Sequence, residues 1–271
     1  MIKEDTLKLK KIALNVRKRV LVMAKKKRIH IGPAFSLVEI LTILYSIKLR
    51  KLEKNHIILS KGHGAMALYA VLAELGELPQ GVIDDFGSEN NILAGHPMSG
   101  IPGIEIPTGS LGHGLSIGAG YAISAKLNNS NDRTFVILGD GELNEGSVWE
   151  AIMFSAHNKL NGLVAIVDRN GYQQSNNTES VLSLEPLDQK WKSFGWDVKV
   201  VDGHSFEELD LAIEMALTST EKPTVIIAKT VKGKGIDFME NNSSWHMGIL
   251  DNEVDFINAI NSLNTTTSCV D

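Results

Sequence analysis

The chain has 271 residues, 43% of them hydrophobic, which is enough for a substantial core in one large domain or two small ones. Its net charge of −5 gives no electrostatic basis for binding nucleic acid, and no apolar run is long enough to span a membrane. Its single cysteine, Cys269, cannot form an internal disulfide, and its charged first residues do not resemble a secretory signal, so we expect a cytoplasmic protein.

The first predicted element is an amphipathic helix over residues 6–28. Leu9, Ile12 and Val16 fall on one face at the spacing of a helix. The segment is also rich in Lys and Arg, which we interpret as a solvated helix face rather than a surface for nucleic acid or membrane.

A loop, a helix and a strand are predicted next. Residues 30–35 contain Gly and Pro and are expected to form a loop. Ser36 and Glu39 have the spacing of a capping box, which would open a helix that ends near Ile47. The apolar run at residues 56–59 predicts a short buried strand.

The segment after this strand is rich in glycine. Residues 61–64 (Lys-Gly-His-Gly) precede a helix expected at residues 65–75, so a polar side chain lies where the strand gives way to the helix. Residues 76–110 hold several prolines and predict a long irregular excursion, a kind of loop that is usually functional in a compact domain. Residues 112–125 predict a helix of small residues, which would pack closely against the sheet or a partner chain.

The most informative stretch is residues 135–172. An apolar strand ends on Gly-Asp-Gly at residues 139–141, a helical pattern follows, and a second apolar strand at residues 163–167 ends on Asp-Arg-Asn at residues 168–170. Strand, helix and strand in this order predict a right-handed crossover between parallel neighbours.

Asp140 and Asn170 therefore follow the carboxyl ends of two neighbouring strands, at the edge where open α/β sheets bind ligands. The glycines beside Asp140 would let a phosphate approach the backbone, and the start of the next helix offers free N–H groups to an anion. A carboxylate and an amide oxygen at such a place suit Mg²⁺ or Ca²⁺. The sequence thus predicts a cation that bridges the protein and a diphosphate.

The remaining chain predicts two further strands, at residues 197–201 and 224–231, and a helix at residues 186–194. Ser205 and Glu208 form a second capping box at the start of another helix.

No repeat and no linker is evident, so the whole chain, residues 1–271, is predicted to be one domain. Its fold class is α/β, with a doubly wound, mostly parallel sheet and helices on both faces. The polar residues 264–271 are expected to form a disordered tail.

Five histidines lie at or near expected element junctions rather than on apolar helix faces. They are His30, His63, His96, His113 and His246. Imidazole titrates near neutral pH, so such residues can exchange protons with hydroxyl groups of a sugar.

The Gly-Asp-Gly at residues 139–141, joined with Asn170, resembles the thiamine diphosphate motif, and the longer run Gly-Asp-Gly-Glu-Leu-Asn-Glu-Gly resembles transketolases. From about Leu7 to Gly248 the chain resembles the N-terminal half of a transketolase. This implies the thiamine-diphosphate-binding fold, in the domain type that holds the diphosphate.

Roles for individual residues follow from the same resemblance. It implies that the catalytic histidines are His30, His63, His96 and His246. It implies that the residues contacting the cofactor are His63, Gly109, Ser110, Leu111, Gly141, Glu142 and Asn170. It implies that the ligands of Mg²⁺ (or Ca²⁺) are Asp140, Asn170 and the backbone oxygen of Tyr172, and that Glu145 lies in a subunit interface. Two positions depart from the family pattern, Ile31 in place of Pro and His113 in place of Gln.

In transketolases a Glu from a second domain activates the cofactor, and the region of resemblance ends before that domain. The chain therefore resembles the N-terminal subunit of a split, two-chain transketolase, whose partner is a C-terminal subunit carrying this Glu. The resemblance implies a dimer of heterodimers that transfers a two-carbon ketol unit from a ketose phosphate to an aldose acceptor.

Other functions remain open at this point. The chain could be a related half-enzyme, either the α-type subunit of a 2-oxo acid dehydrogenase or a transketolase-like protein of a specialised pathway, or it could be a non-catalytic cofactor-binding subunit. For a nicotinamide-binding dehydrogenase the sequence would need Gly-x-Gly-x-x-Gly, but Ile117 occupies the third position after Gly112 and Gly114.

Overall fold

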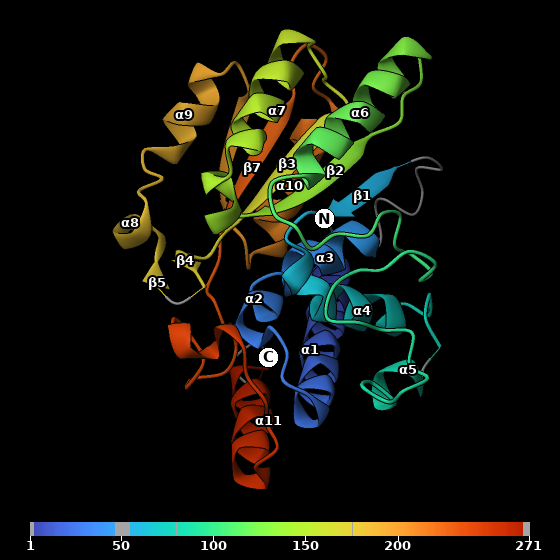
Figure 1. Cartoon of the computed structure of the whole chain (residues 1–271), viewed down its shortest axis with the longest axis vertical. Helices are drawn as coiled ribbons and strands as arrows, with labels where there is room; N and C mark the ends of the chain where they lie inside the picture. Colours follow the sequence, from blue (N-terminus) through green and yellow to red (C-terminus); the bar gives the residue numbers. More distant parts are fainter. Residues whose placement is uncertain (1–2, 47–54, 80, 175, 268–271) are drawn as a thin grey trace.

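The fold is built on a parallel sheet with helices on both faces (Figure 1). The computed structural model describes residues 3–46, 55–79, 81–174 and 176–267. Within them, five parallel strands lie in the order β1 (His56–Leu59), β2 (Thr134–Gly139), β3 (Leu163–Arg169), β7 (Thr224–Lys229) and β6 (Asp197–Asp202). The predicted fold class is confirmed.

The central strands form because short apolar runs can be buried on both faces of a parallel sheet. Every residue of β2 is buried, as is all of β3 except Arg169. Alternate residues face opposite layers, so Phe135 and Ile137 join one core cluster while Val136 and Leu138 join the other.

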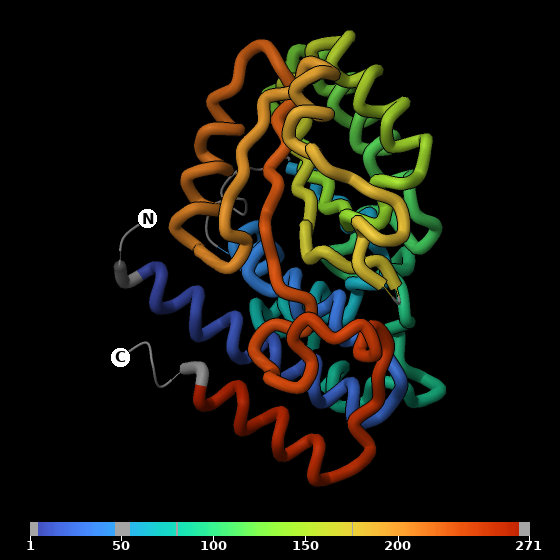
Figure 2. Tube along the Cα trace, turned by 90° about the vertical axis from the view of Figure 1, so that its left-hand side faces the viewer, coloured from blue at the N-terminus to red at the C-terminus, as the bar shows by residue number. Residues whose placement is uncertain are grey.

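Long helices cover the two faces of the sheet. On one face lie α6 (Gly114–Leu127), α7 (Gly146–His157) and α9 (Leu187–Ser193). On the other side α10 (Phe206–Leu217) packs against β6 and β7, and α1 (Lys3–Lys26), α3 (Val38–Tyr45) and α4 (Ala65–Glu74) pack on one another, with α11 (Glu253–Thr267) against α1. Figure 2 shows α11 alongside α1, which brings the last helix against the first.

Shorter elements occupy the connections. They are α2 (Ile31–Phe35), η1 (Gly62–Gly64), α5 (Gly81–Asp84), η2 (Gly141–Asn144), β4 (Tyr172–Gln173), β5 (Asn176–Asn177), α8 (Thr178–Val181) and η3 (Ser243–His246). The described part of the excursion expected at residues 76–110, which leaves out residue 80, is irregular apart from α5, as predicted. Across the described ranges, no helix is long and apolar enough to cross a membrane.

Two local predictions near residue 36 were wrong. Residues 31–35 form the buried helix α2 instead of a loop. The capping box of Ser36 and Glu39 does not form, because both side chains make tertiary contacts: the Ser36 hydroxyl donates to Asp168 at 2.7 Å, and Glu39 pairs with Arg17 at 2.7 Å. The predicted helix end at Ile47 lies outside the described residues.

The predictions for the C-terminal part of the chain agreed better with the structure, though not in every detail. The Ser205 hydroxyl accepts the backbone N–H of Glu208 at 3.2 Å, which confirms the cap, although the Glu208 carboxylate accepts from the backbone of Asp202 instead of closing the box. Residues 264–267, expected to be disordered, continue helix α11. The rest of that expected tail, residues 268–271, lies outside the described residues.

Candidate functional site

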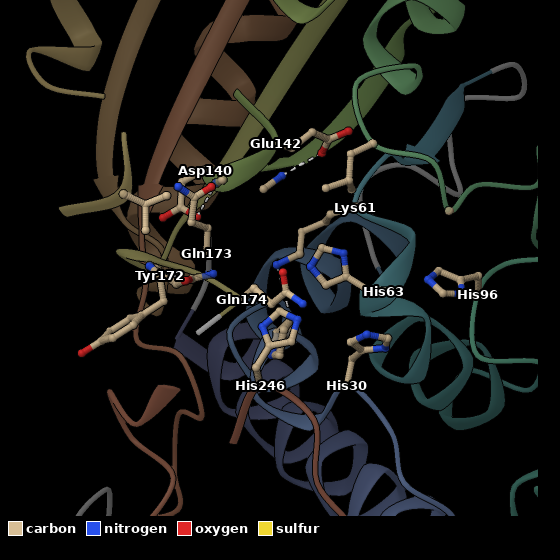
Figure 3. Close-up of a pocket in the computed structure, with 17 residues that line it drawn as sticks. His30, Lys61, His63, His96, Asp140, Glu142, Tyr172, Gln173, Gln174 and His246 are labelled. Carbon is tan, nitrogen blue, oxygen red and sulfur yellow. Dashed lines mark hydrogen bonds between the residues drawn. The ribbon is translucent and has the colours of Figure 1, made fainter. Parts of the chain in front are cut away.

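A cavity of about 420 Å³ lies at the carboxyl edge of the sheet (Figure 3). It is lined by His30, Pro33, Lys61, His63, His96, Gly109, Leu111, Gly139, Asp140, Gly141, Glu142, Asn170, Tyr172, Gln173, Gln174, Val181 and His246. The strands β1, β2 and β3 all end here, so residues far apart in the sequence meet at one place.

Four of the predicted histidines gather at one end of the cavity. The ring of His30 lies 5.6 Å from that of His63, 5.7 Å from that of His96 and 5.4 Å from that of His246, between centroids. The rings of His63 and His246 are 5.7 Å apart. The structure therefore brings together imidazoles from the residue before α2, from η1, from the excursion at residues 76–110 and from η3, while His113 is exposed and lines a neighbouring hollow.

The surroundings of three of these imidazoles, those of His30, His63 and His246, lower their pKa. Burial, followed by the charges of His96, Lys232 and Lys61, lowers the pKa of His30 to about 4. Burial and the nearby Lys232 lower the pKa of His246 to about 3, and burial also places the pKa of His63 well below its ordinary value. Near pH 7 the rings of His30, His63 and His246 are uncharged and can accept hydrogen bonds.

The other end of the cavity holds the predicted metal ligand Asp140. One oxygen of its carboxylate accepts the backbone N–H of Gly141 at 2.8 Å, and the other accepts that of Gly171 at 2.7 Å. The guanidinium of Arg169 lies 3.2 Å from the second oxygen. Burial and the neighbouring Asp168 raise the pKa of Asp140 to about 6.

Asn170 is oriented by Asp168. Its Nδ2 donates to Asp168 at 3.2 Å, and its Oδ1 accepts the backbone N–H of Tyr172 at 3.1 Å. Because the amide nitrogen is engaged by a buried carboxylate, the amide oxygen remains as the group that can bind a cation.

Sequence analysis missed the function of Asp168 itself. It is fully buried and accepts from the Lys61 ammonium and from the hydroxyls of Ser36 and Thr230. Burial alone would raise its pKa, but the charge of Lys61 and these hydrogen bonds together lower it. The only signal in the sequence for this ion pair was that Lys61 and Asp168 follow two of the predicted strands, at residues 56–59 and 163–167.

Lys232 was also missed. Its side chain is 1% exposed, and its ammonium lies 3.2 Å from the carbonyl of Gln174 and 3.0 Å from Nδ1 of His246. Burial lowers its pKa to about 8. The sequence placed it in a Gly-rich segment after the last strand, which looks like an ordinary surface turn.

The predicted cofactor contacts are brought together with one exception. Gly109, Leu111, Gly141 and Glu142 line the cavity, whereas Ser110 is exposed and lines the neighbouring hollow. The Glu142 carboxylate accepts from the Ser60 hydroxyl and from two backbone N–H groups, so it braces the strand-end loops around the cavity.

The predicted interface residue, Glu145, is exposed at the start of α7. Apart from Lys126, the exposed residues of the neighbouring helix α6 are small or apolar, and a side chain at Gly120 would meet nothing within 4 Å. An exposed helix face of this kind allows another helix to approach closely.

The donor set around the cavity fits a bound diphosphate and cation. Gln173 lines the cavity, and its Nε2 is buried without a hydrogen-bond partner among the described residues. Lys232 is a buried ammonium that contacts an uncharged carbonyl and an uncharged ring. Within the described ranges, no three His, Cys, Asp or Glu side chains are arranged to hold a metal, so a cation here would also use amide, carbonyl and ligand oxygens.

Comparisons with known proteins identify the family of this chain. The family model of the transketolase thiamine diphosphate binding domain matches residues 10–266. One subunit of the apulose-4-phosphate transketolase of Phocaeicola vulgatus is 40% identical over 242 residues, which cover 87% of this chain and 86% of that protein. The 6-deoxy-6-sulfo-D-fructose transketolase subunit of a Clostridium species is 38% identical over 226 residues, covering 80% of this chain and 82% of that protein.

Solved structures show the same similarity. The transketolase of Campylobacter jejuni superposes with a TM-score of 0.85 at 26% identity, and the match covers 94% of this chain and 42% of that one. The chain thus spans about two fifths of the length of that solved transketolase, but most of the length of the subunit-type relatives.

Proposed function

This chain belongs to the transketolase family and carries its thiamine diphosphate binding domain, and on this basis we propose that it is the N-terminal subunit of a two-chain transketolase. The main support for the proposal is that one cavity is lined both by four histidines and by the residues predicted to bind the diphosphate and the metal. The reaction is the transfer of a two-carbon ketol unit from a ketose phosphate to an aldose acceptor.

Thiamine diphosphate, when bound, supplies the carbanion chemistry that breaks the carbon–carbon bond of the ketose. This chain would orient the cofactor through Gly109, Leu111, Gly141 and Asn170. His30, His63, His96 and His246 would bind the sugar hydroxyls and move protons at them, because the ring nitrogens of imidazole can both accept and donate a proton. Ser110 and Glu142, both expected to contact the cofactor, would act from the edge of the cavity.

The metal is proposed to be Mg²⁺, or Ca²⁺ in its place, held by Asp140, Asn170 and the backbone oxygen of Tyr172. Support comes from the orientation of the Asn170 amide by Asp168 and from the position of all three residues on the cavity wall. Hard oxygen ligands of this kind match the preference of both cations.

The partner is proposed to be a C-terminal transketolase subunit that supplies the activating Glu, in a dimer of heterodimers. Two relatives are named as transketolase subunits, which supports a partner chain. The exposed face of α6 and the exposed Glu145 are the proposed interface. We further propose that residues 1–271 form one domain and that the enzyme works in the cytoplasm.

The relatives act on apulose-4-phosphate and 6-deoxy-6-sulfo-D-fructose, as their names state. Both names describe modified sugars that carry an anionic group. We propose a donor of the same general kind, a ketose with an anionic group, for this chain.

The test is a transfer assay with and without the partner. The tagged chain is purified, its co-purifying protein is identified by mass, and both are assayed with thiamine diphosphate, Mg²⁺, a ketose phosphate and an aldose acceptor. Two-carbon transfer should require both chains. Robust turnover by this chain alone would contradict the two-chain function, and no transfer by the pair with any ketose phosphate would contradict the activity.

A further inference from the structure

Three ionisable side chains, those of Arg17, Glu39 and His204, are joined in series by hydrogen bonds and do not line the cavity. The guanidinium of Arg17 binds both oxygens of Glu39, at 2.7 and 2.9 Å. Oε2 of Glu39 also lies 2.9 Å from Nδ1 of His204. All three side chains are at least 87% buried, so this arrangement is part of the interior.

The hydrogen bonds fix the position of the proton on the His204 ring. The backbone N–H of Val231 points at Nε2 of His204, 2.9 Å away, and an N–H can only donate. Nε2 must therefore accept, which leaves the ring proton on Nδ1, where it is donated to Glu39.

The segment held by this arrangement is residues 231–234, which begins two residues after the end of β7. His204 binds its first residue at the N–H of Val231, and Nε of Arg17 donates to the carbonyl of Lys234, its last residue, at 3.1 Å. Between these points the N–H of Gly233 donates to the carbonyl of Gly32 at 3.2 Å. The backbone that carries Lys232 is thus bound at both ends.

Lys232 connects this bound segment to His246, which lines the cavity. Its ammonium has only protons to give, so Nδ1 of His246, 3.0 Å away, must accept. The ring proton of His246 then lies on Nε2, the other ring nitrogen. A Cβ at Gly32 would lie 2.6 Å from the backbone oxygen of Trp245 and 3.2 Å from Cγ of Lys232, so glycine lets these groups pack closely there.

We propose that His204 is a positioning residue of this enzyme: through the backbone of Val231 it holds Lys232 in place, and thereby keeps the ring proton of His246 on Nε2. The proposal rests on the proposed function only in treating His246 as a catalytic residue. His204 itself touches neither the cavity nor any predicted ligand of the cofactor.

Two substitutions separate the two bonds of His204. In His204→Asn the amide can reach Glu39 in place of Nδ1 but is too short to replace Nε2 at Val231. In His204→Gln the amide oxygen reaches the position of Nε2 and can accept from Val231. Lys232→Met breaks the path between Val231 and His246 while leaving His204 with both of its partners.

The readout is the tautomer of each histidine, measured by long-range ¹H–¹⁵N NMR on the full chain at pH 7.5, with signals assigned by single-histidine substitutions. In the wild type His204 should show its proton on Nδ1 and His246 on Nε2. In His204→Asn the His246 signals should shift toward a mixture of tautomers, and in His204→Gln they should stay as in the wild type. In Lys232→Met they should show the mixture, and adding His204→Asn should change nothing further.

Two results would overturn the proposal. One is a proton on Nε2 of His204 in the wild type, which would mean that Val231 is not bound and which needs no variant to fold. The other is an unchanged His246 in a folded His204→Asn chain, whatever that change does to thermal stability. Neither measurement needs cofactor or turnover, so failure here is distinct from failure of the transfer assay.

The assembled enzyme gives a second readout. His204→Asn should lower kcat by roughly 10-fold, the size typical of removing a supporting hydrogen bond behind a site, with little change in KM. His204→Gln should restore kcat to within about 2-fold of the wild type. Equal kcat values for the two variants would contradict the role of the Val231 bond.

Discussion

Lys61 and Asp168 form an ion pair in which both side chains are almost completely enclosed, with exposed fractions of 1% and 0%. Lys61 follows β1 and Asp168 lies near the end of β3, so the pair connects two strands on either side of β2. Asp168 also orients Asn170, a predicted metal ligand. The pair therefore links the stability of the sheet edge to the geometry of the site.

Replacing Lys61 by Met should lower the free energy of unfolding by about 3–5 kcal/mol, because the buried carboxylate of Asp168 would lose its counter-charge. The measurement is urea unfolding followed by circular dichroism. Lys192→Met is the matched control, since Lys192 forms an exposed pair with Asp188 and its loss should have no measurable effect. Equal stability of the two variants would show that Asp168 does not depend on Lys61.

Asp140→Asn should weaken Mg²⁺-dependent binding of thiamine diphosphate to the assembled enzyme by more than about 100-fold, because the only carboxylate among the proposed ligands is lost. Titration calorimetry with and without Mg²⁺ measures the effect. Asp84→Asn, at an exposed position on α5, is the control and should bind as the wild type does. Unchanged Mg²⁺ dependence in Asp140→Asn would remove Asp140 from the metal site.

His63→Ala and His96→Ala should each lower turnover by roughly 10²–10⁴-fold if the two imidazoles transfer protons. Binding of Mg²⁺ and cofactor should persist, which separates a chemical role from a folding defect. His157→Ala, an exposed position at the end of α7, should keep full activity. Wild-type turnover in both His63→Ala and His96→Ala would leave them with a structural role.

Gly120→Leu should leave the isolated chain as stable as the wild type or more so, because the site is open and Gly is a poor helix former. Association with the partner should fall if this face of α6 is the interface, as measured by sedimentation velocity. Asn258→Leu on the exposed side of α11 is the matched control. Gly118→Leu should instead damage the fold, because a Cβ there would lie 2.4 Å from Val136. Normal assembly of Gly120→Leu would place the interface elsewhere.

The stability of the chain should fall as the pH drops from about 6.5 to about 4. In this range the unfolded chain binds a proton at His30, whereas burial and the charges near it keep the folded ring neutral. A group whose pKa is lower in the folded state contributes a loss of stability as the pH falls through this window. The free energy of unfolding, measured at several pH values, should therefore change less steeply for His30→Asn. His157→Asn should keep the wild-type slope, and an unchanged slope for His30→Asn would contradict a buried neutral His30.

Much of the fold could be predicted because its signals are local. The apolar runs of β2 and β3 are short and bounded by Gly and polar residues, so their type and direction follow from the chain alone. The helices α4, α6 and α9 were likewise expected within a few residues of their observed bounds, and a helix was expected where α7 lies. The predictions at Ser36 and Glu39 were wrong because distant partners, Asp168 and Arg17, outcompeted the local cap.

The sequence by itself determined which groups end the strands: Asp140, Asn170 and His63 follow apolar runs, and the side chains after parallel strands must share one edge of the sheet. It also singled out five histidines at element junctions, and the resemblance to transketolases selected from them the four that the structure brings together.

Only the tertiary structure showed how these groups are held. Lys61 pairs with Asp168, and the buried Lys232 contacts His246. Arg17, Glu39 and His204 are joined by hydrogen bonds. All of these contacts join residues that are distant in sequence. Burial, hydrogen-bond direction and the pKa of an imidazole depend on which groups surround it in space, and no local pattern in the sequence records those neighbours.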